Sequence, residues 1–217
     1  MQAVEMAHSA RRALSRGGRP TRAEAERRQQ ELLEIAGAMF MKHGFDGTSV
    51  DGVAEAAAMS KRTLYAHYRD KNELFSAVLR NLIDRWLVPI NQFRAGTSDL
   101  EPMLMEIGRH LLTSALAPQA VSLHRIIIAE SERRPEFGRL AYTEGRRPAI
   151  RAIAAGLRRH APLLRADDLE GVAEQFVSLV IDSSLRLAAL GIGPDPHDVE
   201  TRVRAAVDLF LNGTLRS

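Results

Sequence analysis

Residues 48–75, TSVDGVAEAAAMSKRTLYAHYRDKNELF, contain two short apolar patterns of helical spacing that are separated by four residues. Each predicted helix is shorter than the ~12–15 residues that an isolated helix needs to persist in water. Both must therefore be stabilised by packing on a neighbour. The apolar stripe from Leu32 to Phe40 in the preceding predicted helix offers that surface. The stretch thus predicts a compact three-helix unit.

The ends of these helices carry recognisable caps. Gly44 followed by Phe45 is typical of a helix C-terminus with its hydrophobic contact. Thr48, with Asp51 three residues later, is expected to cap the first short helix, and Ser60 the second. The turn between the two short helices is therefore bounded by caps on both sides.

Apolar anchors set the orientation of the second short helix. Met59 and Leu64 occupy the N′ and N4 positions of a hydrophobic staple, and Tyr68 follows Leu64 by one turn. The exposed N-terminal face then carries Lys61, Arg62, Thr63 and Tyr65. Such a face, with free helix N–H groups and basic side chains, suits a helix-turn-helix that binds DNA. Spacing alone also permits an inert helical hairpin with a solvated face.

The rest of the chain also shows helical spacing, and no convincing period-2 strand occurs after residue 23. We therefore expect an all-α fold with a disordered basic arm over residues 1–22, a three-helix head over 23–70 and a larger helical body over 71–217. Asp70 and Glu73 predict a capping box for the helix joining head and body. Pro148 is expected to kink or split one body helix. The body helices are predicted at about 100–116, 119–133, 135–160, 168–190 and 196–212.

Charge and composition point to a cytoplasmic protein that meets a polyanion. The first 22 residues hold five arginines and one glutamate, a net charge of +4, whereas the whole chain carries +3. An arm of this composition has two interpretations: it contacts DNA, or it is a solvated N-terminal segment without a binding role. The chain has no cysteine, and we see neither a signal-peptide core nor a run of ~20 apolar residues. We expect no membrane contact.

The motif in residues 48–75 closely resembles the DNA-binding signature of TetR-family transcriptional repressors, and the match extends over about residues 24–79. The later segment LHRIIIAESERRPEFGRLAYTEGRRPAI more loosely resembles the AefR-type C-terminal domain of some of these repressors. One departure is Ala58, which stands where the family usually has a turn glycine. By this resemblance, the DNA-binding residues would be Thr48, Ser49, Ser60, Lys61, Arg62, Thr63, Tyr65, His67 and Lys71. By analogy with the basic arms of other helix-turn-helix proteins, Arg19 and Arg22 would also contact DNA.

A single head covers too little DNA to specify one site, so a two-fold dimer on a palindromic double-stranded operator is expected. The segment 168–190 is apolar on two sides, which requires burial on two sides. In the family that it resembles, the last two long helices form half of a four-helix dimer interface. Both faces could instead be core of one subunit. The expected homodimer residues are Phe176, Val180, Ile181, Leu187, Val203, Val207 and Phe210.

The remaining helices are expected to enclose a cavity for an unidentified small-molecule effector, whose binding would move the helix that begins at Lys71. His124 and Asp182 could orient a ligand or serve structural hydrogen bonds. The expected lining residues are Trp86, Met103, Ile107, His110, Leu111, Leu123, Ile127 and Tyr142.

Two other classes of protein remain as alternatives. An all-helical enzyme, or a small-molecule-binding protein without a role on DNA, would share the helical body. We find no paired-histidine metal spacing, phosphate-binding glycine loop or serine elbow, so we expect no catalytic residues, cofactor or metal. An architectural DNA-binding protein would need a basic body, yet residues 76–217 hold 18 basic and 17 acidic residues. The expected function is therefore a ligand-responsive transcriptional regulator, most simply a repressor.

Overall fold

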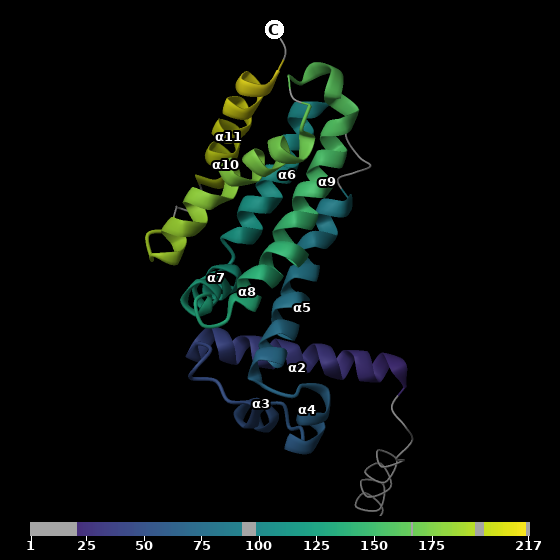
Figure 1. The fold of residues 1–217 in the computed structure, drawn as a ribbon, viewed down its shortest axis with the longest axis vertical. Helices are drawn as coiled ribbons and strands as arrows, with labels where there is room; N and C mark the ends of the chain where they lie inside the picture. The colour runs from purple at the N-terminus through teal and green to yellow at the C-terminus, as the bar shows by residue number, and fades with distance from the viewer. Residues whose placement is uncertain (1–20, 93–98, 166, 194–197, 216–217) are drawn as a thin grey trace, which may run out of the picture.

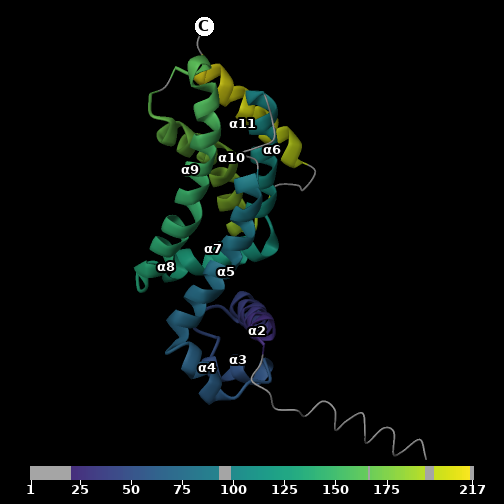
Figure 2. The ribbon, with the colours of Figure 1, turned by 90° about the vertical axis from the view of Figure 1, so that its right-hand side faces the viewer.

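A computed structural model describes residues 21–92, 99–165, 167–193 and 198–215. These residues form an all-helical fold, as predicted, in which the only bridge between extended residues is an isolated one joining Leu164 and Leu215. Helices α2–α4 form a head at one end, α6–α11 form a body at the other, and α5 runs from head to body (Figures 1 and 2). The helices are α2 Arg22–His43, α3 Val50–Ala56, α4 Lys61–His67, α5 Lys71–Gln92, α6 Leu100–Ala115, α7 Pro118–Glu130, α8 Pro135–Leu140, η2 Ala141–Arg146, α9 Arg147–Leu157, η3 Arg158–Leu163, α10 Leu169–Ala189 and α11 Val199–Thr214.

Helix α2 ends at the predicted glycine cap. Gly44 has φ 74°, a conformation that glycine adopts readily, and its N–H donates to the carbonyl oxygen of Phe40. The ring of Phe45 stacks on that of Phe40 with their centroids 5.8 Å apart. This cap turns the chain sharply toward α3.

Helix α5 begins with one half of the predicted capping box. The Asp70 carboxylate accepts the backbone N–H of Glu73 at 2.8 Å. The Glu73 carboxylate does not reach back to Asp70 but accepts the backbone N–H of Arg69, one residue earlier, at 2.7 Å. The helix then continues through Pro89 to Gln92.

The helix expected to kink or split at Pro148 changes its hydrogen-bonding pattern there but stays helical throughout. The segment expected as one helix over 135–160 contains α8, the π-helical turn η2, α9 and the 3-10 helix η3. Pro148 lies at the start of α9, and its ring removes a backbone N–H and crowds the preceding turn. A π-helical turn before it relieves that crowding, because it widens the helix locally.

Two hydrophobic clusters hold the molecule together. One lies in the body and joins α6, α9, α10 and α11. The other contains the core of the head and continues through α5 into Leu123 and Ile126 of α7 and Phe137 and Leu140 of α8. The head is therefore packed directly on α7 and α8 of the body.

The predicted dimer residues require a correction. Within a single chain, Phe176 is fully buried, and its ring packs edge-on against that of Phe210 at 5.1 Å. A side chain without accessible surface in one chain has nothing to offer a partner, so the interface prediction is wrong for these buried positions. Ile181 and Leu187 are partly buried. The buried five are Phe176, Val180, Val203, Val207 and Phe210.

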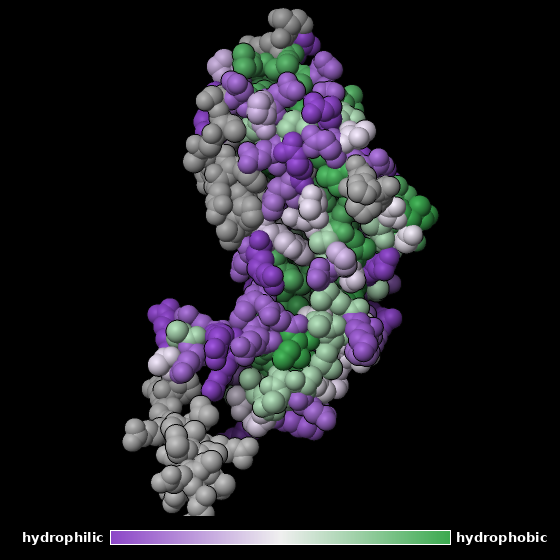
Figure 3. Space-filling model, turned by 180° about the vertical axis from the view of Figure 1, so that it is seen from behind, coloured by the Kyte–Doolittle hydropathy of each residue, from purple (hydrophilic) through white to green (hydrophobic). Residues whose placement is uncertain are grey.

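Other apolar side chains of the same two helices do reach the surface. Leu179 of α10 is 43% exposed and Leu209 of α11 is 62% exposed. Seen from behind, hydrophobic residues emerge in patches between hydrophilic ones (Figure 3). In the described residues, no single helix is both long enough and apolar enough to cross a membrane.

Candidate DNA interface and ligand cavity

Helix α4 is held in place by its cap and by two buried side chains. Ser60 is the N-cap, as predicted, and its hydroxyl accepts the backbone N–H of Thr63 at 3.1 Å. Leu64 is fully buried, and Tyr68 is 6% exposed, so both anchors lie in the core of the head. Burial also raises the pKa of Tyr68. The helix can therefore turn only one face outward.

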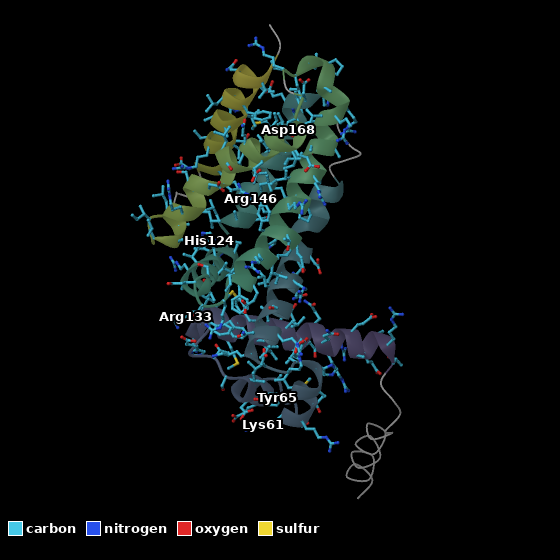
Figure 4. All side chains as sticks on the ribbon, viewed as in Figure 1. Lys61, Tyr65, His124, Arg133, Arg146 and Asp168 are labelled. Carbon is cyan, nitrogen blue, oxygen red and sulfur yellow. The ribbon has the colours of Figure 1, made fainter. Side chains whose placement is uncertain are left out.

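That outer face carries the predicted basic and polar side chains. Lys61, Arg62, Thr63 and Tyr65 are exposed, and Figure 4 shows Lys61 and Tyr65 at the end of the head that is remote from the body. The Lys61 ammonium donates to the Asp51 carboxylate of α3 at 2.6 Å, and this hydrogen bond raises the pKa of Lys61. The ion pair joins the N-terminus of α4 to α3.

Ser49, rather than Thr48, caps α3. The Ser49 hydroxyl accepts the backbone N–H of Gly52 at 3.0 Å, so the predicted cap at Thr48 is wrong by one residue. Thr48 is 2% exposed, and its hydroxyl lies 2.9 Å from the Gly44 carbonyl oxygen and 3.2 Å from that of Met39. It therefore satisfies carbonyl groups at the end of α2 and does not face a DNA backbone.

The other predicted DNA contacts lie in different environments. The Lys71 ammonium, partly buried, donates to the carbonyl oxygens of Phe45 at 2.9 Å and Asp46 at 3.3 Å, so it joins α5 to the loop after α2. His67 is exposed at the end of α4. Arg22, in the first turn of α2, is exposed and pairs with Glu26 at 2.8 Å. Arg19 lies outside the described residues.

The turn before α4 contains a left-handed alanine. Ala58 has φ 49°, and among the described residues it is the only one other than glycine with a positive φ. A side chain in this conformation costs roughly 1–2 kcal/mol, because Cβ approaches the following carbonyl oxygen. The backbone at Ala58 thus has the left-handed conformation that favours the glycine usual at this position of the TetR signature, although the residue here is alanine.

A cavity of about 430 Å³ lies in the body. Helix α5 contributes Leu79, Ile83 and Trp86 to its wall, and α10 contributes Val177, Ile181 and Leu185. Of the predicted ligand residues, the structure places six at the cavity wall: Trp86, His110, Leu111, Leu123, Ile127 and Tyr142.

Two predicted ligand residues lie elsewhere, and one predicted dimer residue lies here. Met103 and Ile107 are 1% and 3% exposed and pack in the body core, so their assignment to the cavity is corrected. Both belong to the cluster that α6 forms with α9, α10 and α11, a choice of neighbour that helical periodicity does not reveal. Ile181, expected at the dimer interface, lines the cavity instead.

The polar part of the wall centres on an ion pair. The Arg146 guanidinium makes two hydrogen bonds to the Asp182 carboxylate, at 2.9 and 3.2 Å, and a third to the Ser178 hydroxyl at 2.8 Å. Burial lowers the pKa of His124, and the nearby Asp182 opposes this effect in part. Sequence reasoning missed Arg146, because the adjacent Arg147 is indistinguishable from it in the motif EGRRPA.

Comparison with known families covers both parts of the molecule. Residues 32–78 match the family described as bacterial regulatory proteins, tetR family. Residues 102–213 match the AefR-like transcriptional repressor, C-terminal domain. The second match alone spans more than half of the chain.

Curated relatives are transcriptional regulators. The HTH-type transcriptional regulator RutR from Escherichia coli is 34% identical over 96 residues, which cover 44% of this chain and 45% of RutR. The chain thus spans less than half the length of RutR. The HTH-type transcriptional repressor Rv1474c from Mycobacterium tuberculosis is 28% identical over 192 residues, or 88% of this chain and 94% of that protein.

Solved structures share the fold over most of the chain. A TetR-family regulator from Mesorhizobium loti has a TM-score of 0.81 and 25% identity, with 91% of this chain and 100% of that chain covered. The flavonoid-responsive regulator FrrA has a TM-score of 0.71 and 31% identity, with 88% and 98% covered. Together with the family matches to head and body, these similarities show that the chain belongs to the TetR family of transcriptional regulators.

Proposed function

We propose that this regulator is a repressor that binds a palindromic operator as a two-fold dimer, with α4 of each head in a major groove. The observation that carries this proposal is the outer face of α4, on which exposed basic and polar side chains are held by two buried anchors. A helix of this kind can enter the major groove with its N-terminal residues at the base edges. The side chains concerned are Lys61, Arg62, Thr63 and Tyr65.

Other contacts would fix the head on the DNA backbone. Ser49, Ser60, His67 and Arg22 are exposed around α3, α4 and the start of α2, where hydroxyl and basic groups suit phosphates. The buried Thr48 is left out of this set, and the Lys71 ammonium would act through the loop that it holds. We propose that Arg19 in the basic arm reaches the neighbouring minor groove.

We propose that the dimer forms through the outer faces of α10 and α11. Leu179 and Leu209 are large apolar side chains exposed on adjacent helices, a placement typical of the centre of an interface. Two copies packed in this way would present two recognition helices related by a two-fold axis.

We further propose that a small organic effector binds in the body cavity and changes operator affinity. Helix α5 supports this idea because it begins at the head and lines the cavity with Leu79, Ile83 and Trp86. A ligand that favours one placement of α5 would change the separation of the two α4 helices. The name of FrrA states that it responds to flavonoids. We also propose that this chain acts on DNA in the cytoplasm and carries no enzymatic activity.

The test is a DNA-binding measurement at stated salt concentration, because phosphate contacts make affinity strongly dependent on salt. Fluorescence anisotropy would compare an inverted repeat found beside the protein's own gene with a scrambled duplex. We expect Arg62→Ala to weaken binding to the repeat by about tenfold or more, because it removes a base-edge donor. The matched control is Arg151→Ala, on the exposed surface of α9, which should leave affinity within about twofold. Equal affinities for Arg62→Ala and wild type would contradict the proposal.

A further inference from the structure

The positive charge in the polar wall of the cavity, that of Arg146, is already paired with a carboxylate of the same wall. Arg146 uses both terminal nitrogens on Asp182 and Ser178, so the charge of the guanidinium is matched by a carboxylate at 2.9 Å. The pair joins η2 to α10 across the cavity wall, and the Arg146 side chain is 28% exposed. An acidic ligand would therefore find no unbalanced positive charge at this guanidinium.

Among the described lining residues, Arg146 and Asp182 are the charged pair, and the other groups that can titrate are the imidazoles of His110 and His124 and the phenol of Tyr142. Burial lowers the pKa of His124, because it disfavours the charged form of this ring. Nε2 of His110 lies 3.1 Å from the carbonyl oxygen of Trp86. The lining thus presents dipoles and hydrogen-bonding groups beside an arginine whose charge is matched by Asp182.

A neutral hydroxyl group fits this wall better than an ion does. Each carboxylate oxygen accepts more than one hydrogen bond, so Asp182 can remain paired with Arg146 and still accept a ligand O–H. A ligand carboxylate would have to lose its hydration and compete with Asp182 for Arg146, and the desolvation of ions is costly in a largely apolar site.

The remainder of the wall is apolar and partly aromatic. Trp86 and Tyr142 contribute aromatic side chains, and Ile83, Ile127 and Ile181 contribute aliphatic surface. Ring pairs prefer offset or edge-on contacts, which favours an aromatic ligand in such a wall. A cavity of about 430 Å³ falls within the range that holds organic molecules of drug size.

We propose that the cavity selects uncharged, hydroxylated aromatic compounds, that Asp182 accepts the ligand hydroxyl, and that the Arg146–Asp182 pair excludes acids. This inference rests on the proposed role of the cavity as the effector site. Two probes of the same ring system separate the classes: 2-naphthol, which is uncharged at about pH 8, and 2-naphthoate, which is ionised. Calorimetric titration gives their affinities, and quenching of Trp86, the only tryptophan of the chain, reports binding at the cavity.

For the wild-type protein we expect naphthol to bind at least about tenfold more tightly than naphthoate. Asp182→Asn leaves Arg146 without its counter-charge and should reverse this preference in favour of naphthoate. Arg146→Gln removes the positive charge and should weaken naphthoate binding further, which provides a second variant if the first does not fold. Glu101→Gln, an equal loss of negative charge on the exposed start of α6, should keep the wild-type preference.

Three results would overturn the inference. They are naphthoate binding to the wild type as tightly as naphthol, a wild-type ratio of naphthol to naphthoate affinity in the folded Asp182→Asn and Arg146→Gln proteins, and binding of neither probe. Operator binding is measured on the same wild-type sample. Retarded DNA without selective probe binding would refute the inference and leave the proposed regulator standing. Selective probe binding without retarded DNA would support the inference and refute the role on DNA.

Discussion

The guanidinium carbon of Arg134 lies 4.2 Å from the ring centroid of Phe45, so a side chain of the body sits on an aromatic ring of the head. Arg134 also pairs with the buried Glu130 and donates to the Asn72 side chain at 3.3 Å. The ring of Phe45 in turn contacts that of Phe137 in α8 at 5.3 Å. Because the next residue, Gly138, lines the cavity, this contact places the cavity one residue from the packing between head and body.

The first prediction concerns the buried pair at this junction. Arg134→Ala removes the partner of Glu130, whose side chain is 9% exposed, and should lower the free energy of unfolding by about 3 kcal/mol. Urea denaturation would measure the loss. Arg133→Ala is the matched control, because its pair with Asp46 is exposed and should contribute less than about 1 kcal/mol.

A double-mutant cycle separates the pair from general packing. If the pair is coupled, Glu130→Ala combined with Arg134→Ala should destabilise the protein by less than the sum of the single changes. Strictly additive losses in the free energy of unfolding would show that Glu130 and Arg134 do not stabilise the protein as a pair.

The second prediction concerns the left-handed turn before α4. Ala58→Gly should raise the free energy of unfolding by about 0.5–1 kcal/mol, because relief of the Cβ strain exceeds the entropy that glycine loses. Ala66→Gly, inside α4 with helical geometry, should instead lower it by about 1 kcal/mol. Denaturant midpoints of both variants give the comparison. Destabilisation by Ala58→Gly would mean that the positive φ is not retained in solution.

The third prediction concerns the proposed dimer face. Leu209→Glu places a charge at the centre of that face and should raise the dimer dissociation constant by at least about tenfold. Sedimentation velocity over a dilution series would measure it. Leu163→Glu, at another exposed leucine in η3, serves as the control and should leave the dimer intact. Two variants with equal dissociation constants would place the interface elsewhere.

The fourth prediction is a pH dependence at the start of α5. The pKa of Glu73 is lowered because its carboxylate accepts the backbone N–H of Arg69 and then its side-chain N–H. A lowered folded-state pKa gives stability above the unfolded value of 4.5, and this stability is lost as pH falls through the folded value. Glu73→Gln should therefore be less stable than wild type near pH 7, and the difference should shrink as the pH falls below 4.5 and through the lowered folded-state pKa. A difference that persists at acid pH would assign the effect to packing.

Residues close in sequence allowed the head to be predicted well. The glycine cap at Gly44, the cap at Ser60 and the anchors Leu64 and Tyr68 depend on neighbours within about one or two turns of helix. The wrong cap at Thr48 is also a local error, of one residue, since the adjacent hydroxyls of Thr48 and Ser49 could each cap α3. Only the packing of Thr48 under the end of α2 distinguishes them.

The sequence by itself therefore determined most of the helices, the caps at Gly44 and Ser60 and the exposed face of α4, because capping and periodicity act within a few residues. Tertiary structure alone decided which apolar face of α10 is core, that Ile181 faces the cavity and Met103 does not, and that Arg146 meets Asp182. Helical periodicity states which side chains share a face, but the neighbour that covers this face is set by long-range packing.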